Sequence, residues 1–435
     1  MDPDGLPDAL KRETAIAVAG QDSDIRNLTT LIVGPPDSPY QYGFFEFEIK
    51  FGKEYPTQPP SVRALTTNHG KCRFNPNIYA NGKVCLSILG TWTGESGEQW
   101  SSAQGLESIL ISIQSLLSSN PYENEPSYED RKGPGDKKNM ASYIAKIRHE
   151  TLRIAVIRPL EESLDIRPDG GITRPNSKAP PDEEEEDLTL EDDMAFNPFA
   201  DLRKRRFLWY FDSYLQTIDT AEQVTSHESR FEKMPFESGD NTMDGHFDYP
   251  TLRRRLNFIQ ETIINETQSW AAEGLCAKER EKGIAMNMQR QYEQIVENFK
   301  QQKNFTVDLA LVGKNPFVWE LTYFGRPMTQ LDGGIFKVKI HISPRFPDEQ
   351  PRVFMQSPLF HVRVSRHGVL CYFSQRQEEM RYHVEGIVAA LEDENPPYDP
   401  RVIVNPEASK LFWGSADERR QYKRALRRSV ERCAE

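Results

Sequence analysis

An internal duplication constrains this chain more than any other feature of its sequence. The glycine-led run Gly43-Phe44-Phe45-Glu46-Phe47-Glu48-Ile49 recurs 291 residues later as Gly334-Ile335-Phe336-Lys337-Val338-Lys339-Ile340. The same spacing relates Tyr55-Pro56 to Phe346-Pro347, and a spacing of 286 relates Cys85 to Cys371. Two copies so far apart indicate a duplicated domain and argue against a solenoid, whose repeats follow one another every ~20–50 residues.

Each copy has the same local pattern. In the first copy Phe45, Phe47 and Ile49 alternate with charged residues, which predicts a half-buried antiparallel strand. A proline-rich connection and a long loop that carries a cysteine follow, and then apolar residues at helical spacing from Leu106 to Leu117. We therefore predict an α+β fold for each copy, an antiparallel β-meander flanked by helices.

The region between the copies is predicted to be mostly helical. Helical patterns cover about 138–165, 197–222 and 249–302, with a break expected near Gly274 and Gly283. The stretch 280–302 is expected to pack as the first helix of the second copy. The predicted domains are therefore 1–135, a helical extension at 136–279, and 280–435.

The net charge of −12 comes mainly from one segment. Nine acids and no base lie between Asp182 and Asp193, and without those nine acids the net charge becomes −3. We interpret about 166–195 as a disordered acidic loop within the extension. Docking of a basic partner on this run is the alternative. The global charge gives no reason to expect nucleic-acid or membrane partners.

Composition narrows the class of protein further. The chain has 435 residues with 37% hydrophobic residues, enough for real cores, and no run near the ~18 apolar residues of a membrane helix. Five scattered cysteines argue against a disulfide scaffold and against a Cys-based metal site. With no signal-peptide pattern at its N-terminus, we expect a soluble protein of the cytoplasm and nucleus. The phosphate-binding motif GxxxxGK[ST] is absent from the sequence, so no bound ATP is expected.

The sequence leaves several roles open for Cys85, the first cysteine of the repeated pair. A lone cysteine among apolar neighbours is often an inert core residue, and no nearby histidine supports a Cys–His protease. A thiol that carries an acyl group needs less activation, because its ordinary pKa of ~8.5 already supplies some thiolate. Such a site needs an amide donor for the developing oxyanion, which Asn77 could supply. Asn77 could equally hold the loop through a hydrogen bond to the backbone, and the two roles are compatible.

The motifs around this cysteine resemble the catalytic core of ubiquitin-conjugating enzymes. In chain order they are Gly34-Pro35 with Pro39-Tyr40, Gly43-x-Phe45, Tyr55-Pro56 with Pro59-Pro60, Asn75-Pro76-Asn77, Asn81-Gly82-Lys83-Val84-Cys85-Leu86 and Trp100-Ser101-x-Ala103. Four further runs resemble the Z-type subfamily, and with them the likeness covers about 24–265: Ser87 to Gly94, Asn120-Pro121-Tyr122, Ile147 to Thr151 and Gly245 to Tyr249. The second copy resembles another ubiquitin-conjugating fold.

The resemblance implies roles for particular residues. Cys85 would form a thioester with ubiquitin or a ubiquitin-like modifier, and Asn77 would be the oxyanion-side asparagine. Glu125, before a proline, would be the acidic residue that meets the incoming lysine. The implied partners are the modifier, an activating enzyme that uses the ATP, a ligase and protein substrates, and no cofactor is implied. Asn75 stands where the family has histidine and is expected to be structural; the family's first helix is poorly represented, with only Leu6 to Val18 as a candidate.

The second copy keeps only part of this pattern. It has Cys371 and an acid before a proline at Asp399. However, the triplet Asn75-Pro76-Asn77 of the first copy corresponds to His361-Val362-Arg363, so arginine stands in the position of Asn77. It is interpreted as an inert scaffold, with a second working or regulatory thiol as the alternative. For the whole chain the rival hypothesis is a non-catalytic adaptor that binds partners of the ubiquitin pathway. The tail 416–435 is expected to form a solvated amphipathic helix, and His149 and His246 are expected to be structural.

Overall fold

The computed structural model describes residues 15–21, 24–94, 97–167, 171, 197–280, 282–302 and 305–433. They form two compact units. The first unit is Met1–Arg203 with Ile218–Ile259, and the second unit is Lys204–Thr217 with Gln260–Glu435. The helical extension between the copies is therefore shared by the two units. The predicted acidic loop at 166–195 lies almost entirely outside the described residues.

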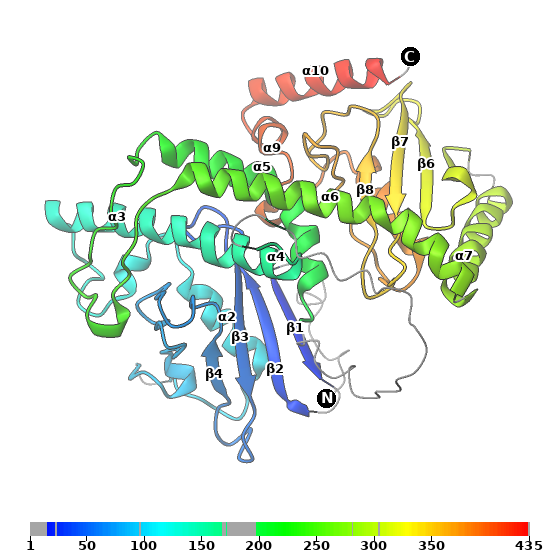
Figure 1. Cartoon of the computed structure of the whole chain (residues 1–435). Coiled ribbons are helices and arrows are strands. Elements are labelled where there is room, and N and C mark those ends of the chain that lie inside the picture. The colour runs from blue at the N-terminus through cyan, green and yellow to red at the C-terminus, as the bar shows by residue number, and fades with distance from the viewer. Residues whose placement is uncertain are drawn as a thin grey trace. The chain divides into compact units, whose positions relative to one another are not determined.

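The first unit is built on a four-stranded antiparallel sheet in the order β1-β2-β3-β4 (Figure 1). The strands are β1 (Ile16–Gln21), β2 (Asp24–Val33), β3 (Phe44–Lys50) and β4 (Ser61–Ala64). In β3 the side chains of Phe45, Phe47 and Ile49 are buried and the alternating charged ones are not, which confirms the predicted half-buried strand. Helix α2 (Leu106–Leu116) adds Ile109, Leu110 and Ile113 to the same core.

The candidate segment for the family's first helix is a strand where the structure describes it. The sequence left only Leu6 to Val18 for that helix, but Ile16, Ala17 and Val18 begin β1, and Ile16 pairs with Ile32 of β2. The side chains of Ile16 and Val18 pack against the core of the sheet, and the backbone gains the hydrogen bonds of a ladder. Tertiary pairing thus overrides a weak local helical pattern. Residues 6–14 lie outside the described part of the chain.

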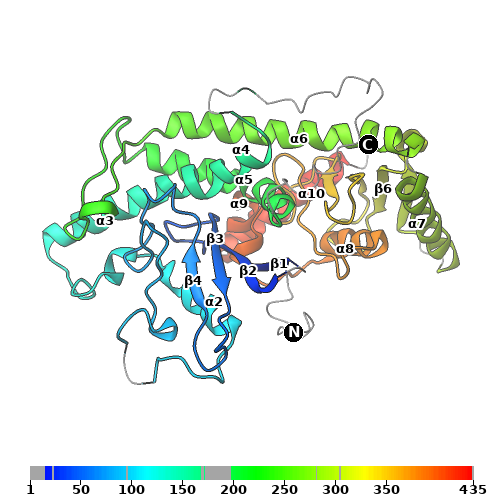
Figure 2. The same ribbon diagram turned by 60° about the horizontal axis from the view of Figure 1, so that its bottom comes forward.

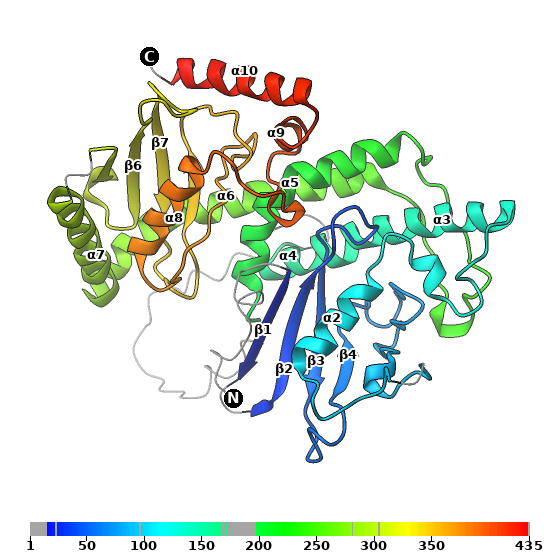
Figure 3. The same ribbon diagram turned by 180° about the vertical axis from the view of Figure 1, so that it is seen from behind.

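The second unit repeats the first sheet in detail. Its strands are β5 (Val307–Leu311), β6 (Val318–Phe324), β7 (Ile335–His341) and β8 (Arg352–Met355), again antiparallel and in sequence order. The registers correspond residue for residue, because Val33 pairs with Phe44 and Phe324 pairs with Ile335, 291 positions on. Helix α8 (Met380–Glu392) lies across its sheet as α2 does across the first (Figure 3).

Helix α7 (Lys282–Gln301) belongs to this second fold, as predicted. It lies beside β6 in Figures 1 and 2, and its Met288 and Ile295 are buried in the same core as the sheet. At the end of the chain α9 (Pro406–Phe412) leads into α10 (Ala416–Arg432), which buries only one face and confirms the predicted amphipathic helix.

The extension contains long helices near the predicted positions. They are α3 (Pro134–Glu150), a π-helical stretch over Thr151–Ile157, α4 (Arg158–Ser163), α5 (Ala200–Glu222) and α6 (Tyr249–Arg280). The expected break lies next to Gly283, since α6 ends at Arg280 and α7 begins at Lys282, whereas α6 runs through Gly274. A Cβ at Gly274 would lie 2.2 Å from the ring of Phe317, so glycine is needed there for close packing.

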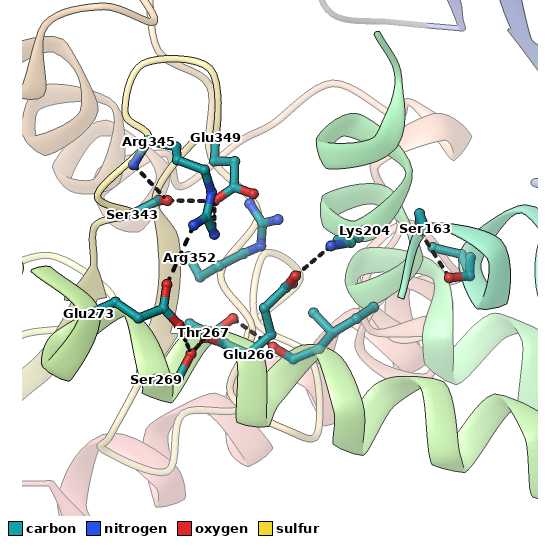
Figure 4. A network of polar contacts seen from close by, with 12 residues as sticks. Ser163, Lys204, Glu266, Thr267, Ser269, Glu273, Ser343, Arg345, Glu349 and Arg352 are labelled. Atoms are coloured by element: carbon teal, nitrogen blue, oxygen red, sulfur yellow. Dashed lines mark hydrogen bonds and ion pairs between the residues drawn. The ribbon is translucent and has the colours of Figure 1, made fainter. Parts of the chain in front are cut away.

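The end of α6 is tied to the second sheet by polar contacts (Figure 4). The Glu273 carboxylate lies 3.4 Å from Arg345, which also pairs with Glu349 at 2.9 Å. The guanidinium of Arg352 lies 5.2 Å from the ring centre of the fully buried Trp270. These contacts explain why α6 from Gln260 onward, about two thirds of the helix, belongs to the second unit. Among the described residues, none of the helices is both long and apolar enough to cross a membrane.

A candidate acyl-transfer site at Cys85

Cys85 and Asn77 are held together by two reciprocal hydrogen bonds. The backbone N–H of Cys85 donates to the Asn77 carbonyl at 2.8 Å, and the Asn77 side-chain amide donates to the Cys85 carbonyl at 3.1 Å. The second bond is the loop-holding contact considered from the sequence. It also places an amide donor beside the thiol residue, which is where an oxyanion formed on a Cys85 thioester needs one.

Asn75 anchors the triplet from inside the core. Its side chain is fully buried, accepts a hydrogen bond from the Asn77 backbone N–H at 2.8 Å, and donates to the Leu116 carbonyl at 2.8 Å and the Tyr40 hydroxyl at 3.1 Å. With these partners the buried amide is well satisfied. The replacement of the family's usual histidine by Asn75 is therefore structural, as expected.

Glu125 directly follows the short helix η3 (Pro121–Asn124). Its side chain is 22% exposed and its carboxylate lies 3.2 Å from the Arg73 guanidinium. Arg73 is itself 5% exposed and also donates to the Pro76 carbonyl at 2.5 Å. Burial raises the pKa of the Glu125 carboxyl above its usual value, and Arg73 acts in the opposite direction.

Tyr79 completes the group around the thiol. Burial raises the pKa of its phenol, and the neighbouring Cys85 raises that pKa further, while the Arg73 guanidinium lies 4.7 Å from its ring centre. The sequence analysis missed both Tyr79 and Arg73. The available signals were a cation in the otherwise apolar run Cys72 to Phe74, and an aromatic two positions after Asn77.

A loop of the helical extension, residues 236–241, contacts the site. The Asn241 side chain accepts a hydrogen bond from the Ala80 backbone N–H at 3.2 Å, within the loop that joins Asn77 to Cys85. Phe236 packs against Tyr122 with ring centres 5.5 Å apart. The loop is anchored by an ion pair between Lys146 and Glu237 at 2.5 Å, with side chains 0% and 1% exposed. The extension is therefore part of the construction of this site.

The second copy keeps the backbone arrangement without the amide. The Cys371 backbone N–H donates to the Arg363 carbonyl at 2.8 Å, as Cys85 does to Asn77. Its acid, Asp399, is engaged by Arg401 at 2.8 Å. Although burial opposes it, hydrogen bonds from Arg401 hold the pKa of Asp399 below its ordinary value. The structure thus brings a thiol and an acid into the same fold position, with arginine in place of the asparagine.

Helix α5 covers the second copy's cysteine loop. The ring of Trp209 packs on Phe373 with centres 5.7 Å apart, and the Asp212 carboxylate accepts a hydrogen bond from the Arg366 backbone N–H at 3.2 Å. The Tyr210 hydroxyl donates to the carbonyl of Arg401, next to the Asp399 loop, at 2.8 Å. Cys371 is 0% exposed. One turn of α5 thus lies against both the cysteine loop and the loop of Asp399.

His149 is a structural residue, as expected. Its Nδ1 lies 3.0 Å from the Glu150 carboxylate, and its Nε2 accepts a hydrogen bond from the Asp248 backbone N–H at 3.1 Å. His246 is exposed. Within the described ranges, no three His, Cys, Asp or Glu side chains are grouped to hold a metal ion.

Comparison with known proteins identifies the class. The family described as "Ubiquitin-conjugating enzyme" matches residues 8–151 and 287–428, which is more than half of the chain. The chain belongs to the ubiquitin-conjugating enzyme family, and both copies of the duplication carry the match.

Individual relatives match part of this chain. "Ubiquitin-conjugating enzyme E2 Z" of Homo sapiens is 38% identical over 250 residues, 58% of this chain and 59% of that protein. The Danio rerio protein of the same name is 39% identical over 240 residues, 55% of this chain and 60% of that protein. The human "Dual E2 ubiquitin-conjugating enzyme/E3 ubiquitin-protein ligase BIRC6" is 39% identical over 154 residues, 35% of this chain and 3% of that protein. The chain thus spans about three fifths of the E2 Z relatives.

Proposed function

We propose that this protein accepts ubiquitin or a ubiquitin-like modifier as a thioester on Cys85 and passes it to a substrate lysine or a ligase. The observation that supports this most directly is the reciprocal hydrogen bonding of Cys85 and Asn77, with Glu125, Arg73 and Tyr79 grouped beside them. A thiol carrier needs an amide donor and an acid in this arrangement, and a buried structural cysteine needs neither.

The loading step is a transthiolation. The Cys85 thiolate attacks the thioester carbonyl of the modifier carried by an activating enzyme; a new C–S bond forms at Cys85, and the donor sulfur leaves as a thiolate. The ATP that makes the first thioester is used by the activating enzyme, so this chain needs no bound cofactor. Cytoplasm and nucleus, where such partners meet, are its proposed location.

The discharge step assigns roles to Asn77 and Glu125. The lysine amine attacks the thioester carbonyl, the C–S bond breaks, and Cys85 leaves as a thiolate. Asn77 donates a hydrogen bond to the oxyanion of the tetrahedral intermediate, and Glu125 accepts the surplus proton of the amine. A free lysine has a pKa of ~10.4, so it needs this help at neutral pH.

The adaptor hypothesis suits the second copy better than the whole chain. Both thiols are buried, Cys85 at 3% exposed and Cys371 at 0%, so burial alone does not separate the copies. In the second copy, however, the triplet lacks the amide, Asp399 is engaged by Arg401, and α5 packs on the cysteine loop. We propose that this copy is a non-catalytic scaffold.

A non-reducing gel tests the proposal. The purified protein is mixed with activating enzyme, ATP and ubiquitin, beside Cys85→Ser and the matched control Cys371→Ser. We expect a thiol-sensitive adduct in the wild type and in Cys371→Ser, and its loss as a thioester in Cys85→Ser. A thioester that survives Cys85→Ser contradicts the assignment of the site. Repeating the gel with other modifiers and activating enzymes separates an adaptor from a protein tested with the wrong modifier.

A further inference from the structure

We propose that Arg73 is the positioning residue of this site: its guanidinium ties the Glu125 carboxylate to the asparagine triplet and so fixes it beside the Cys85 thioester. The inference rests on the proposed function, because it assumes that Glu125 acts during discharge. It adds a residue for which neither the motifs nor the comparisons supply a role.

The contacts of Arg73 join two segments that the sequence separates. One NH group donates to the Pro76 carbonyl at 2.5 Å, in the middle of the triplet, and the same nitrogen lies 3.2 Å from the Glu125 carboxylate. Glu125 is 52 residues away in the sequence and follows a short helix. Without a tie of this kind, the position of its carboxylate relative to the thiol depends on that loop alone.

The guanidinium is itself held in place by aromatic rings. Its carbon atom lies 4.7 Å from the ring centre of Tyr79 and 5.8 Å from that of Phe236, which the extension supplies. Cations stack favourably on such rings when partly desolvated. Because Arg73 is 5% exposed, its side chain has little freedom. A buried, stacked and planar donor can orient a carboxylate in a way that a mobile surface lysine cannot.

The charge of Arg73 also acts on the protonation of Glu125. The charged groups that act on the Glu125 carboxyl are Arg73 and Glu129, and Tyr79, whose own pKa Glu125 raises, is a further titratable neighbour. Burial raises the pKa of Glu125, Arg73 lowers it, and Glu129 raises it slightly. Removal of the cation therefore moves the pKa further up, and the carboxylate form then requires a higher pH.

The second copy offers an internal comparison. The position that matches Arg73 is Leu359, and the acid there is held by an arginine two residues away on its own loop, Arg401. Asp399 is thus hydrogen-bonded within its own loop, where the Arg363 charge also lowers its pKa, whereas Glu125 is hydrogen-bonded to a side chain that also binds the triplet. The cross-link between triplet and acid exists in the copy that keeps the asparagine.

The test separates charging from discharge. Each variant is loaded with ubiquitin, the activating enzyme is stopped, and loss of the thioester to free lysine is followed across a pH series. In Arg73→Met we expect charging within about twofold of wild type and discharge slowed about tenfold, the size expected for loss of one charge-assisted hydrogen bond. The break in the plot of log rate against pH should move to higher pH. Arg73→Lys keeps a cation, so its break should stay near the wild-type position with part of the rate restored.

A second arginine provides the matched control. Arg203 is also 5% exposed and pairs with a carboxylate, Glu46 of β3, in the same unit. Arg203→Met should lower the melting temperature without moving the pH break. A role through Glu125 further requires that Arg73→Met adds nothing to Glu125→Gln, and this double variant is the decisive comparison.

Several outcomes overturn the proposal. Arg73 would be only a structural residue if the effects of Arg73→Met and Glu125→Gln were additive. The same conclusion would follow if Arg73→Met slowed charging and discharge equally, or if it left the pH break unmoved. If the wild type charges on Cys85 and Arg73→Met discharges at the wild-type rate, this inference fails and the proposed function stands. If no thioester forms with any modifier, the proposed function fails and the inference falls with it.

Discussion

The two copies of the ubiquitin-conjugating fold share a backbone and differ in chemistry. Their sheets have the same strand order and register, and in both the cysteine N–H donates to the carbonyl of the third triplet residue at 2.8 Å. The side chain of that triplet residue is Asn77 in one and Arg363 in the other. The fold therefore requires only the backbone bond, and the proposed acyl transfer requires the amide.

The copies also use the helical extension in different ways. In the first unit the loop with Asn241 and Phe236 supports the cysteine loop from behind. In the second unit α5 presents Trp209 and Asp212 to the cysteine loop itself. The same extension thus stabilises one site and covers the other.

Removing the Trp209 ring, which packs on the loop of Cys371, should have the largest effect on stability. Trp209 is 5% exposed, and truncation of a buried aromatic of this size to alanine costs ~3–5 kcal/mol of unfolding free energy. Trp209→Ala should lower the urea midpoint and speed alkylation of Cys371, measured by mass spectrometry, while thioester formation on Cys85 persists. The matched control Trp92→Ala changes a tryptophan that is 45% exposed and should do much less. Unchanged alkylation of Cys371 in a destabilised Trp209→Ala would show that α5 is not its cover.

Removing the amide from the first copy should slow one step selectively. Loss of an oxyanion donor typically costs ~2.7–4 kcal/mol, or roughly 10²–10³ in rate. Asn77→Ala should therefore slow lysine discharge far more than charging, in single-turnover gels of each step. Arg363→Ala, at the matching position of the second copy, should leave both rates unchanged. Equal slowing of both steps in Asn77→Ala would sink the oxyanion role, because loss of the loop-holding bond alone disturbs both.

The triplets should also differ in their response to acid. His361 accepts a hydrogen bond from the Arg363 backbone N–H at 3.1 Å, as Asn75 does from Asn77, but histidine can be protonated. Burial, and then Arg363, lower the pKa of His361 from 6.5 to about 4. Between those values the unfolded chain binds a proton that the folded chain does not, so stability falls as the pH drops from 6.5 to 4, by about 2 kcal/mol at pH 5.

His361→Asn should reduce that loss. Because the asparagine can make the same hydrogen bond but cannot titrate, the second unit's stability should change less between pH 7 and 5 in urea titrations. The slope with pH is the quantity to compare, since the smaller side chain also leaves a cavity. His341, whose pKa burial also lowers to about 4, remains as a residual source of acid sensitivity. An unchanged slope in His361→Asn would mean that His361 does not carry this acid response.

Much of the fold and part of the site could be predicted from the sequence. Periodic patterns of apolar residues predicted the strands β3 and β7 and the helices of the extension, and recurring motifs revealed the duplication. The pairing of Cys85 with Asn77 could be predicted because the two residues lie close together in one motif. Strand β1 was missed because an edge strand is defined by its partner, and Gly274 was misjudged because its reason is the ring of Phe317. Arg73 was missed because its partner Glu125 is 52 residues away.

The sequence by itself determined that the chain contains two ubiquitin-conjugating folds and that only one keeps the cysteine with its asparagine. Local spacing is enough to recognise these features, because each strand, turn and motif is specified by residues that lie close together in the sequence. Only the tertiary structure decided that Arg73 links the triplet to Glu125 and that α5 packs against the loop of Cys371. Those contacts join segments that are tens to hundreds of residues apart. Their geometry exists only after the core has packed, since burial is what brings these side chains together and limits their freedom.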